Sequence, residues 1–180
     1  RSYKQIVHEK KELIRRYHDS QPFDVEILKK NGLIARGGEG FVFSSDASQK
    51  NSFVIKIIHL TPPKVKALVQ AEAMRRAQGV PHTAQLICYS VEDAAYVMTF
   101  VPGETIRISG SIDRITDEQW KEFFNTLKIL DDKGLSVDLF PENILFDGQY
   151  LNIIDYSLPN GVLDLFSVQL VNFLRKIAFP

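Results

Sequence analysis

The Pro102-Gly103 pair separates two parts of the chain that differ in the pattern of their apolar residues. Before this pair, short runs rich in β-branched and aromatic residues alternate with turns that contain Gly, Ser or Asn, which predicts an antiparallel sheet. The expected strands cover 32–34, 41–44, 53–58, 84–90 and 95–100, and one helix is expected at 64–78. After the pair, apolar residues recur at helical spacing around one small hairpin. The order predicts an α+β fold with a β-rich half followed by a helical half.

The helical half begins after a polar stretch at 104–114, which we expect to be a linking loop. A capping box at Thr116–Gln119 predicts the start of a helix that ends at Gly134. Its apolar stripe is expected to be core: Trp120, Phe123, Phe124, Leu127 and Leu130. Strands at 144–146 and 151–154 flank Asp147-Gly148, a dipeptide favoured in two-residue hairpin turns. A last buried helix is expected at 163–177.

Residues 2–18 have the apolar spacing of an amphipathic helix, which we expect to pack on a domain. The resulting division is a helical extension at 1–22, a β-rich lobe at 23–101 and a helical lobe at 102–180.

Composition limits the partners and the location of the protein. Lys plus Arg and Asp plus Glu number 22 each, so no overall charge attracts the chain to nucleic acid or to an anionic membrane. No apolar run approaches the ~20 residues of a membrane span, and the charged first residues do not resemble a signal peptide. The single cysteine, Cys88, excludes an intramolecular disulfide and a thiolate metal cluster. We therefore expect no membrane span and a cytoplasmic location.

Two features of the β-rich half suggest a phosphate site. Gly37, Gly38 and Gly40 lie between two predicted strands, where a glycine-rich hairpin can bring backbone N–H groups close to phosphates. Lys56 ends an apolar β-branched run, and its charge needs a partner if its stem is buried. Glu72, in the middle of the next predicted helix, is the candidate partner. An ordinary glycine turn and a solvated lysine remain the alternatives when these features are taken alone.

The stretch from Ser136 to Ser157 carries the most specific pattern. Asp138 is followed five residues later by Asn143 and, beyond the hairpin, by Asp155. This order resembles the catalytic loop and the magnesium-binding motif of protein kinases. The upstream features match in the same order: the glycine-rich loop, Lys56, Glu72, and a hinge at 96–103. The chain thus resembles a protein kinase, with a bilobal fold that has an antiparallel N-lobe and a truncated helical C-lobe.

The resemblance implies a set of roles in ATP- and Mg²⁺-dependent phosphoryl transfer to a protein Ser or Thr hydroxyl. Asp138, Lys56 and Glu72 would be catalytic: Asp138 orients the acceptor hydroxyl, and Lys56, held by Glu72, fixes the α- and β-phosphates. Asn143 and Asp155 would hold Mg²⁺, which prefers oxygen ligands. The nucleotide would contact Ala35, Gly37, Gly38, Gly40, Val42, Lys56, Met98, Phe100 and Val101. A protein substrate and an activating partner protein are the expected partners, without nucleic acid.

Several departures from the kinase pattern keep two alternatives open. Ala35 replaces a usual glycine, Val137 replaces the arginine before the catalytic Asp, and Phe140 stands where many kinases carry a lysine. Asp164 comes only nine positions after Asp155, so an activation segment has almost no room. This compactness resembles kinases that bacterial pathogens inject into host cells, which would place the protein in the host cytosol as a virulence effector. The alternatives are a pseudokinase that serves as a protein-binding module and a small-molecule kinase.

Overall fold

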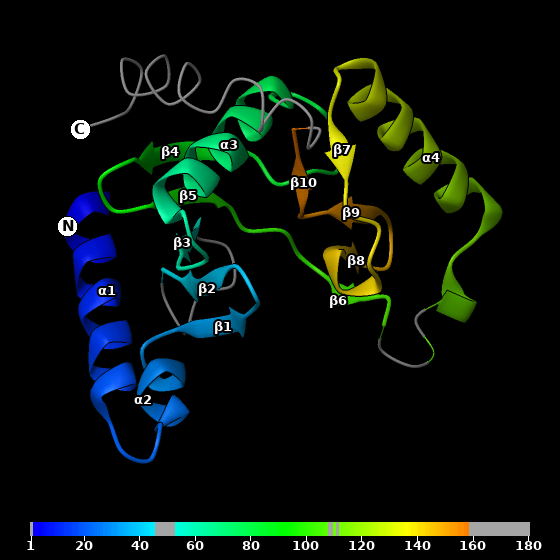
Figure 1. Cartoon of the computed structure of the whole chain (residues 1–180). Helices are drawn as coiled ribbons and strands as arrows, with labels where there is room; N and C mark the ends of the chain where they lie inside the picture. The colour runs from blue at the N-terminus through cyan, green and yellow to red at the C-terminus, as the bar shows by residue number, and fades with distance from the viewer. Residues whose placement is uncertain (1, 46–52, 108–109, 111, 159–180) are drawn as a thin grey trace. The chain divides into compact units, whose positions relative to one another are not determined.

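The sheet predicted for the β-rich half is present. The structure is a computed structural model that describes residues 2–45, 53–107, 110 and 112–158. Five strands form an antiparallel sheet in the order β1-β2-β3-β5-β4 (Figure 1). They are β1 (Leu33–Arg36), β2 (Gly40–Ser44), β3 (Phe53–Ile58), β4 (Leu86–Ser90) and β5 (Ala95–Thr99). The predicted α+β class and the five strands are confirmed, whereas the kinase-like arrangement of two lobes stays a prediction.

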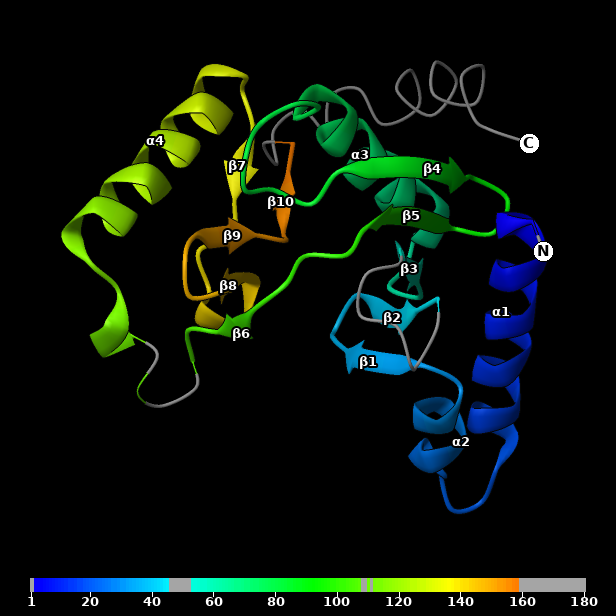
Figure 2. The same ribbon diagram turned by 180° about the vertical axis from the view of Figure 1, so that it is seen from behind.

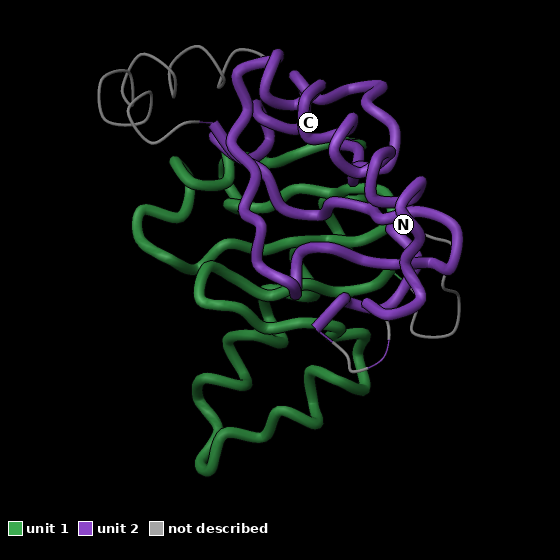
Figure 3. The backbone as a smooth tube through the Cα atoms, turned by 90° about the vertical axis from the view of Figure 1, so that its right-hand side faces the viewer, with its two compact units in different colours: residues 1–68, 87–100, 168–180 green, residues 69–86, 101–167 purple. Residues whose placement is uncertain are grey.

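The chain forms two compact units, coloured separately in Figure 3. Unit 1 contains the described residues up to Leu68 and those of Ile87–Phe100, and therefore almost all of the sheet. Unit 2 contains Val69–Leu86 and the described residues from Val101 onwards. Helix α3 (Pro63–Arg76), predicted at 64–78, begins in unit 1 and ends in unit 2. The helix predicted at 163–177 lies outside the described residues.

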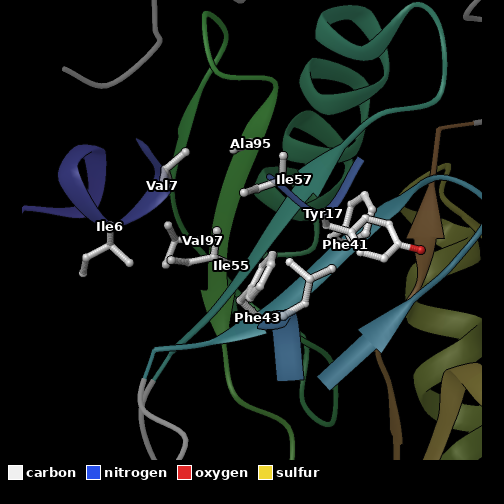
Figure 4. Packing of buried hydrophobic residues seen from close by; sticks show 10 residues of the cluster. Ile6, Val7, Tyr17, Phe41, Phe43, Ile55, Ile57, Ala95 and Val97 are labelled. Carbon is white, nitrogen blue, oxygen red and sulfur yellow. The ribbon is translucent and has the colours of Figure 1, made fainter. Parts of the chain in front are cut away.

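The core of unit 1 lies between helix α1 (Tyr3–Asp19) and one face of the sheet (Figure 4). α1 begins with a capping box in which Ser2 and Gln5 bond each other's backbone amides. Alternate side chains of the strands point toward α1 because successive residues of a strand face opposite sides. The buried residues of this cluster are Ile6, Val7, Tyr17, Leu28, Phe41, Phe43, Ile55, Ile57, Ala95 and Val97. The predicted N-terminal helix is thus confirmed, and it supplies part of the core.

A short helix, α2 (Val25–Lys30), precedes the sheet and was not expected from the sequence. Six residues are too few to display a helical apolar period. Its local signals are Asp24, whose side chain accepts from the Glu26 amide, and two lysines in the last turn. The buried Lys10 of α1 donates to the Asn31 carbonyl oxygen at 2.6 Å, which joins the two helices.

In unit 2, helix α4 (Asp117–Asp132) has the predicted capping box between Thr116 and Gln119. Its end is a Schellman motif in which the Gly134 amide donates to Asp131 and the Leu135 amide donates to Leu130. Gly134 has φ +73°, a conformation that favours glycine, so the predicted stop is confirmed.

The predicted apolar stripe of α4 is only partly buried. Phe123 and Leu130 are buried together with Thr126, whereas Phe124 is 59% exposed. Phe124 follows Phe123 directly, and consecutive helical residues point about 100° apart, so both cannot face the same core. The expectation that Phe124 belongs to the core was wrong. α4 contacts two strands of the same unit, β7 (Ser136–Val137) and β9 (Leu151–Ile153).

Short strands complete the described part of unit 2 (Figure 2). β6 (Glu104–Thr105), β8 (Ile144–Phe146) and β9 (Leu151–Ile153) form one sheet, and β7 (Ser136–Val137) pairs with β10 (Tyr156–Ser157). Two 3₁₀ turns lie at Ile112–Arg114 and Pro141–Asn143. The stretch 104–114 is therefore not entirely a loop, because Glu104 and Thr105 pair with Phe146 and Leu145.

The hairpin between β8 and β9 differs from the predicted two-residue turn at Asp147-Gly148. The pairing ends at Phe146 and Leu151, and the Asp147 amide donates to the Tyr150 carbonyl oxygen. The Asp147 carboxylate accepts from the amides of Gln149 and Tyr150 at 2.8 and 2.7 Å. Asp147 therefore precedes the tight turn and caps it. Burial would raise the pKa of the Asp147 carboxyl, but the hydrogen bonds from the two amides outweigh burial and lower this pKa.

None of the helices in the described ranges is long and apolar enough to cross a membrane.

Candidate functional site

The residues predicted to carry the chemistry fall into two groups, one in each unit. Ala35, the three glycines, Val42, Lys56, Met98 and Phe100 belong to unit 1, and Glu72, Val101, Asp138, Asn143 and Asp155 belong to unit 2. The chain passes from unit 1 to unit 2 between the two predicted hinge residues Phe100 and Val101, both half-buried.

Asp138, Asn143 and Asp155 are brought together by hydrogen bonds that involve the main chain. The Asp138 amide donates to the Asp155 carbonyl oxygen at 3.4 Å, and the Ile154 amide donates to the Asn143 carbonyl oxygen at 3.1 Å. The Asn143 side-chain Nδ2 donates to the Asp138 carbonyl oxygen at 3.5 Å. The three predicted residues thus lie in one local network, although Asp155 is 17 positions after Asp138 in the sequence (155 − 138).

Local structure explains why these residues meet. Asp138 follows β7 directly, and Asp155 precedes β10, so the antiparallel pairing of the two strands brings the aspartates side by side. Between them, Pro141 starts a 3₁₀ turn in which the Asn143 amide donates to the Phe140 carbonyl oxygen at 2.9 Å. This turn directs Asn143 back toward Asp138. Asp138 is exposed, while Asn143 and Asp155 are half-buried.

Asn143 and Asp155 carry an amide and a carboxylate oxygen, the donor types that Mg²⁺ prefers, so their chemistry is compatible with the predicted magnesium site. Because Nδ2 of Asn143 is used as a donor to Asp138, its Oδ1 is the atom left to coordinate a cation. No three His, Cys, Asp or Glu side chains among the described residues gather as a metal-binding group. Mg²⁺ does not require such a group, since it is commonly held by one or two protein oxygens together with phosphates and water.

In unit 1, three of the predicted nucleotide contacts form a row across the sheet. The register places Ala35 opposite Val42, and Val42 opposite Lys56. The row continues to Tyr96 on β5, whose ring centroid lies 6.0 Å from the Lys56 Nζ. These side chains lie on the face opposite the α1 core, because their strand neighbours Phe41, Phe43, Ile55 and Ile57 face that core.

Met98 and Lys56 lie on this same face of the sheet. Met98 is opposite Val54 on β3 and is buried, two residues along β5 from Tyr96. The Lys56 side chain is only 15% exposed, and its Nζ lies 3.8 Å from the Glu39 carboxylate of the glycine-rich loop. Sequence reasoning did not identify Glu39 as a partner. A cation with a buried stem therefore lies beside the loop that is predicted to bind phosphates.

The three glycines of the loop have different roles. A Cβ at Gly40 would lie 2.2 Å from the Ile57 carbonyl oxygen, so the packing of β2 on β3 requires glycine there. A Cβ at Gly37 or Gly38 would have no neighbour within 4 Å, which leaves space for a ligand beside the backbone. The loop is closed by the Gly37 amide, which donates to the Gly40 carbonyl oxygen at 3.0 Å. The amides of His59 and Leu60 both donate to the Glu39 carbonyl oxygen, which fixes the loop to the end of β3.

Glu72 is bound by arginines of its own helix. Its side chain is 3% exposed, and its carboxylate accepts two hydrogen bonds from Arg75 at 2.7 Å and one from Arg76 at 3.1 Å. Burial would raise the pKa of Glu72, but the bonds from the two arginines outweigh it and lower the pKa. The spacing of three and four residues could have indicated these partners. Lys56 and Glu72 lie in different units, so their predicted pairing stays a prediction.

No family model matches the chain, and no curated protein matches it either. The resemblance to protein kinases stays a prediction, which rests on the order of the motifs in the sequence.

Proposed function

We propose that this protein transfers the γ-phosphate of ATP to a Ser or Thr hydroxyl of a protein substrate. The observation that carries the proposal is the hydrogen-bond network that joins Asp138, Asn143 and Asp155. Phosphoryl transfer depends more on alignment of the acceptor hydroxyl with the phosphate and on stabilisation of negative charge than on covalent chemistry. A carboxylate such as Asp138 can orient the hydroxyl, and an amide and a carboxylate such as Asn143 and Asp155 can hold a metal ion.

Each residue of the network has a chemical role in this proposal. The exposed Asp138 carboxylate accepts a hydrogen bond from the acceptor hydroxyl and receives its proton as the new P–O bond forms. Asn143 Oδ1 and the Asp155 carboxylate hold Mg²⁺, which neutralises charge on the phosphate oxygens. As the hydroxyl oxygen bonds to the γ-phosphorus, the bond between the γ-phosphorus and the β–γ bridging oxygen breaks. ADP leaves with the bridging oxygen.

The row across the sheet supports nucleotide binding by unit 1. Ala35 and Val42 offer an apolar surface of the kind that contacts a purine ring. Lys56, next in the row, offers one cation to the phosphates, and the open space beside Gly37 and Gly38 leaves room for phosphate oxygens near the Gly38 amide, since the Gly37 amide closes the loop. The combination of an apolar surface, a lysine and a glycine-rich loop on one sheet favours ATP over an uncharged ligand.

A second candidate function is a nucleotide-binding module that does not catalyse transfer. The observation that favours it is Phe140, which is 60% exposed and stands two residues after Asp138. An apolar ring in this place supplies no charge to the γ-phosphate, and with the exposed Leu139 it resembles a protein-binding surface more than a catalytic one.

Phosphoryl transfer by the full chain decides between the two candidates. The purified protein is incubated with γ-labelled ATP, Mg²⁺ and a host-cell extract, beside Asp138→Asn and the matched control Asp132→Asn at the exposed end of α4. We expect label in protein with the parent and the control, and a loss of about 100-fold or more with Asp138→Asn. Equal labelling with the parent and Asp138→Asn would exclude transfer by this site. Label confined to small molecules would show that the acceptor is not a protein.

A further inference from the structure

Tyr156, the residue that follows Asp155, is held by a distant part of unit 2. Its side chain is 2% exposed, and its hydroxyl donates to the Ala84 carbonyl oxygen at 2.5 Å. The two residues are 72 positions apart in the sequence. A buried hydroxyl on the residue next to the predicted metal ligand has no part in the roles assigned above.

The segment around Ala84 also binds the chain on the other side of Asp155. The Ile153 amide donates to the His82 carbonyl oxygen at 2.8 Å, and the Ala84 amide donates to the Ile153 carbonyl oxygen at 3.0 Å. Together these bonds form a parallel bridge between Thr83 and Ile153. The residues 82–84, which we call the anchor segment, thus hold the chain two residues before Asp155 and one residue after it.

The anchor segment is itself fixed within unit 2. The His82 ring stacks on Tyr150 with a centroid distance of 4.2 Å, and its Nε2 lies 3.5 Å from the Glu122 carboxylate of α4. The Thr83 hydroxyl donates to the Val80 carbonyl oxygen at 2.9 Å. The Tyr156 hydroxyl therefore bonds to an acceptor that α4 and the β8–β9 hairpin keep in place.

On its opposite side, the Asp155 segment pairs with β7. Tyr156 lies opposite Val137, and the Asp138 amide donates to the Asp155 carbonyl oxygen. Rotating the main chain at Asp155 would break the Tyr156 bond and leave the buried Ala84 carbonyl without it. The hydroxyl thus favours one conformation of the segment.

We propose that Tyr156 is a positioning residue whose hydroxyl bond to Ala84 fixes the main-chain conformation of Asp155, the predicted metal ligand, before a nucleotide binds. The inference rests on the proposed function, since it assigns the metal site to Asn143 and Asp155. It predicts that the metal-dependent part of ATP binding depends on one hydroxyl group that contacts neither the metal nor the nucleotide.

The test compares Tyr156→Phe with Tyr150→Phe in the full chain. Each change removes one hydroxyl and keeps the ring, and Tyr150 is the ring of the hairpin that stacks on His82. Calorimetry measures the affinity for ATP with Mg²⁺ and with EDTA. We expect Tyr156→Phe to leave the affinity in EDTA unchanged and to lower the gain produced by Mg²⁺ about 10-fold, the effect of one lost buried hydrogen bond. Tyr150→Phe should match the parent in both conditions.

Hydrogen exchange in the absence of nucleotide provides a second measurement. The amides of Asp138 and Ile154 donate to Asp155 and Asn143, so their exchange reports the order of this network. Both should exchange about 10-fold faster in Tyr156→Phe than in Tyr150→Phe. An unchanged Mg²⁺ gain in Tyr156→Phe would overturn the inference while the proposed function stands. If Mg²⁺ does not increase the ATP affinity of the parent protein, the proposed function fails. In that case, amide exchange rates of Asp138 and Ile154 that are unchanged in Tyr156→Phe would still overturn the positioning role.

Discussion

Val42 on β2 and Lys56 on β3 lie directly opposite one another, on the face of the sheet away from the α1 core. A branched apolar side chain and a mostly buried lysine are thereby neighbours across two strands. Both residue types have a use in ATP binding, since one can contact the base and the other the phosphates.

Lys56→Ala should weaken ATP binding and slow transfer, because a lysine on the phosphates acts in the ground state and in the transition state. We expect the Kd for ATP to rise about 10-fold or more, the contribution of a charge-assisted hydrogen bond. Asp138→Ala should differ in kind, with a transfer rate at least about 100-fold lower and an unchanged Kd. Lys64→Ala is the control, because Lys64 pairs only weakly with the exposed Glu92. Equal effects of Lys56→Ala and Asp138→Ala on the Kd would contradict these roles.

Asp155→Ala should abolish the increase in ATP affinity that Mg²⁺ produces. The change removes the carboxylate but keeps the carbonyl oxygen that accepts from the Asp138 amide, so the local fold should persist. Calorimetry with Mg²⁺ and with EDTA measures the effect, and Asp132→Ala on α4 serves as the control. Identical ATP affinity of the parent in both conditions would refute a metal role for Asp155.

Glu72→Gln should make the protein less stable at neutral pH and less sensitive to acid. The pKa of Glu72 is lower in the folded protein than its ordinary value of 4.5, so its carboxylate contributes stability above that pH. The contribution is lost as the pH falls through the lower, folded-state pKa. We expect a cost of about 1–2 kcal/mol near pH 7, since Arg75 and Arg76 are partly exposed. Urea unfolding of both proteins from pH 7 to pH 3 measures the difference, which should shrink with acid. A difference that is independent of pH would show that the ion pairs do not stabilise the fold.

Gly40→Ala should destabilise the protein by about 1–3 kcal/mol, because the added Cβ would overlap the Ile57 main chain. Gly38→Ala is the matched control in the same loop, where an added Cβ meets open space. We expect the control to change the free energy of unfolding by no more than about 0.5 kcal/mol. Equal destabilisation by both changes would mean that the conformation of the loop, not the contact with Ile57, requires glycine at 40.

Local signals in the sequence predicted most of the described elements. The five strands and the Thr116–Gln119 capping box were found because alternation and capping depend on residues close in the chain. The position of Phe124 was wrong because helical spacing alone does not say how wide a buried stripe is. The Asp147-Gly148 dipeptide predicted a turn at these two residues. The turn lies one residue later, because the Asp147 carboxylate accepts hydrogen bonds from the amides of Gln149 and Tyr150.

The candidate site was predicted as a list of residues but not as a set of contacts. Asp138, Asn143 and Asp155 were identified from their order, and the structure places them in one network. Arg75 and Arg76 were not predicted as partners of Glu72, although spacings of three and four residues bring side chains together on a helix. The bond between Tyr156 and Ala84 had no sequence signal, because it joins residues that come together only through the tertiary fold.

The packing of α1 has a consequence for access to the sheet. Ile6, Val7 and Tyr17 cover the face of the sheet that carries Phe41 and Phe43, and the Tyr17 hydroxyl accepts a hydrogen bond from Arg36, the last residue before the glycine-rich loop. Any protein that bound this face of the sheet would first have to displace the chain's own helix. Displacing α1 would also remove the hydrogen bond between Tyr17 and Arg36, and with it a link between the helix and the strand that leads into the glycine-rich loop.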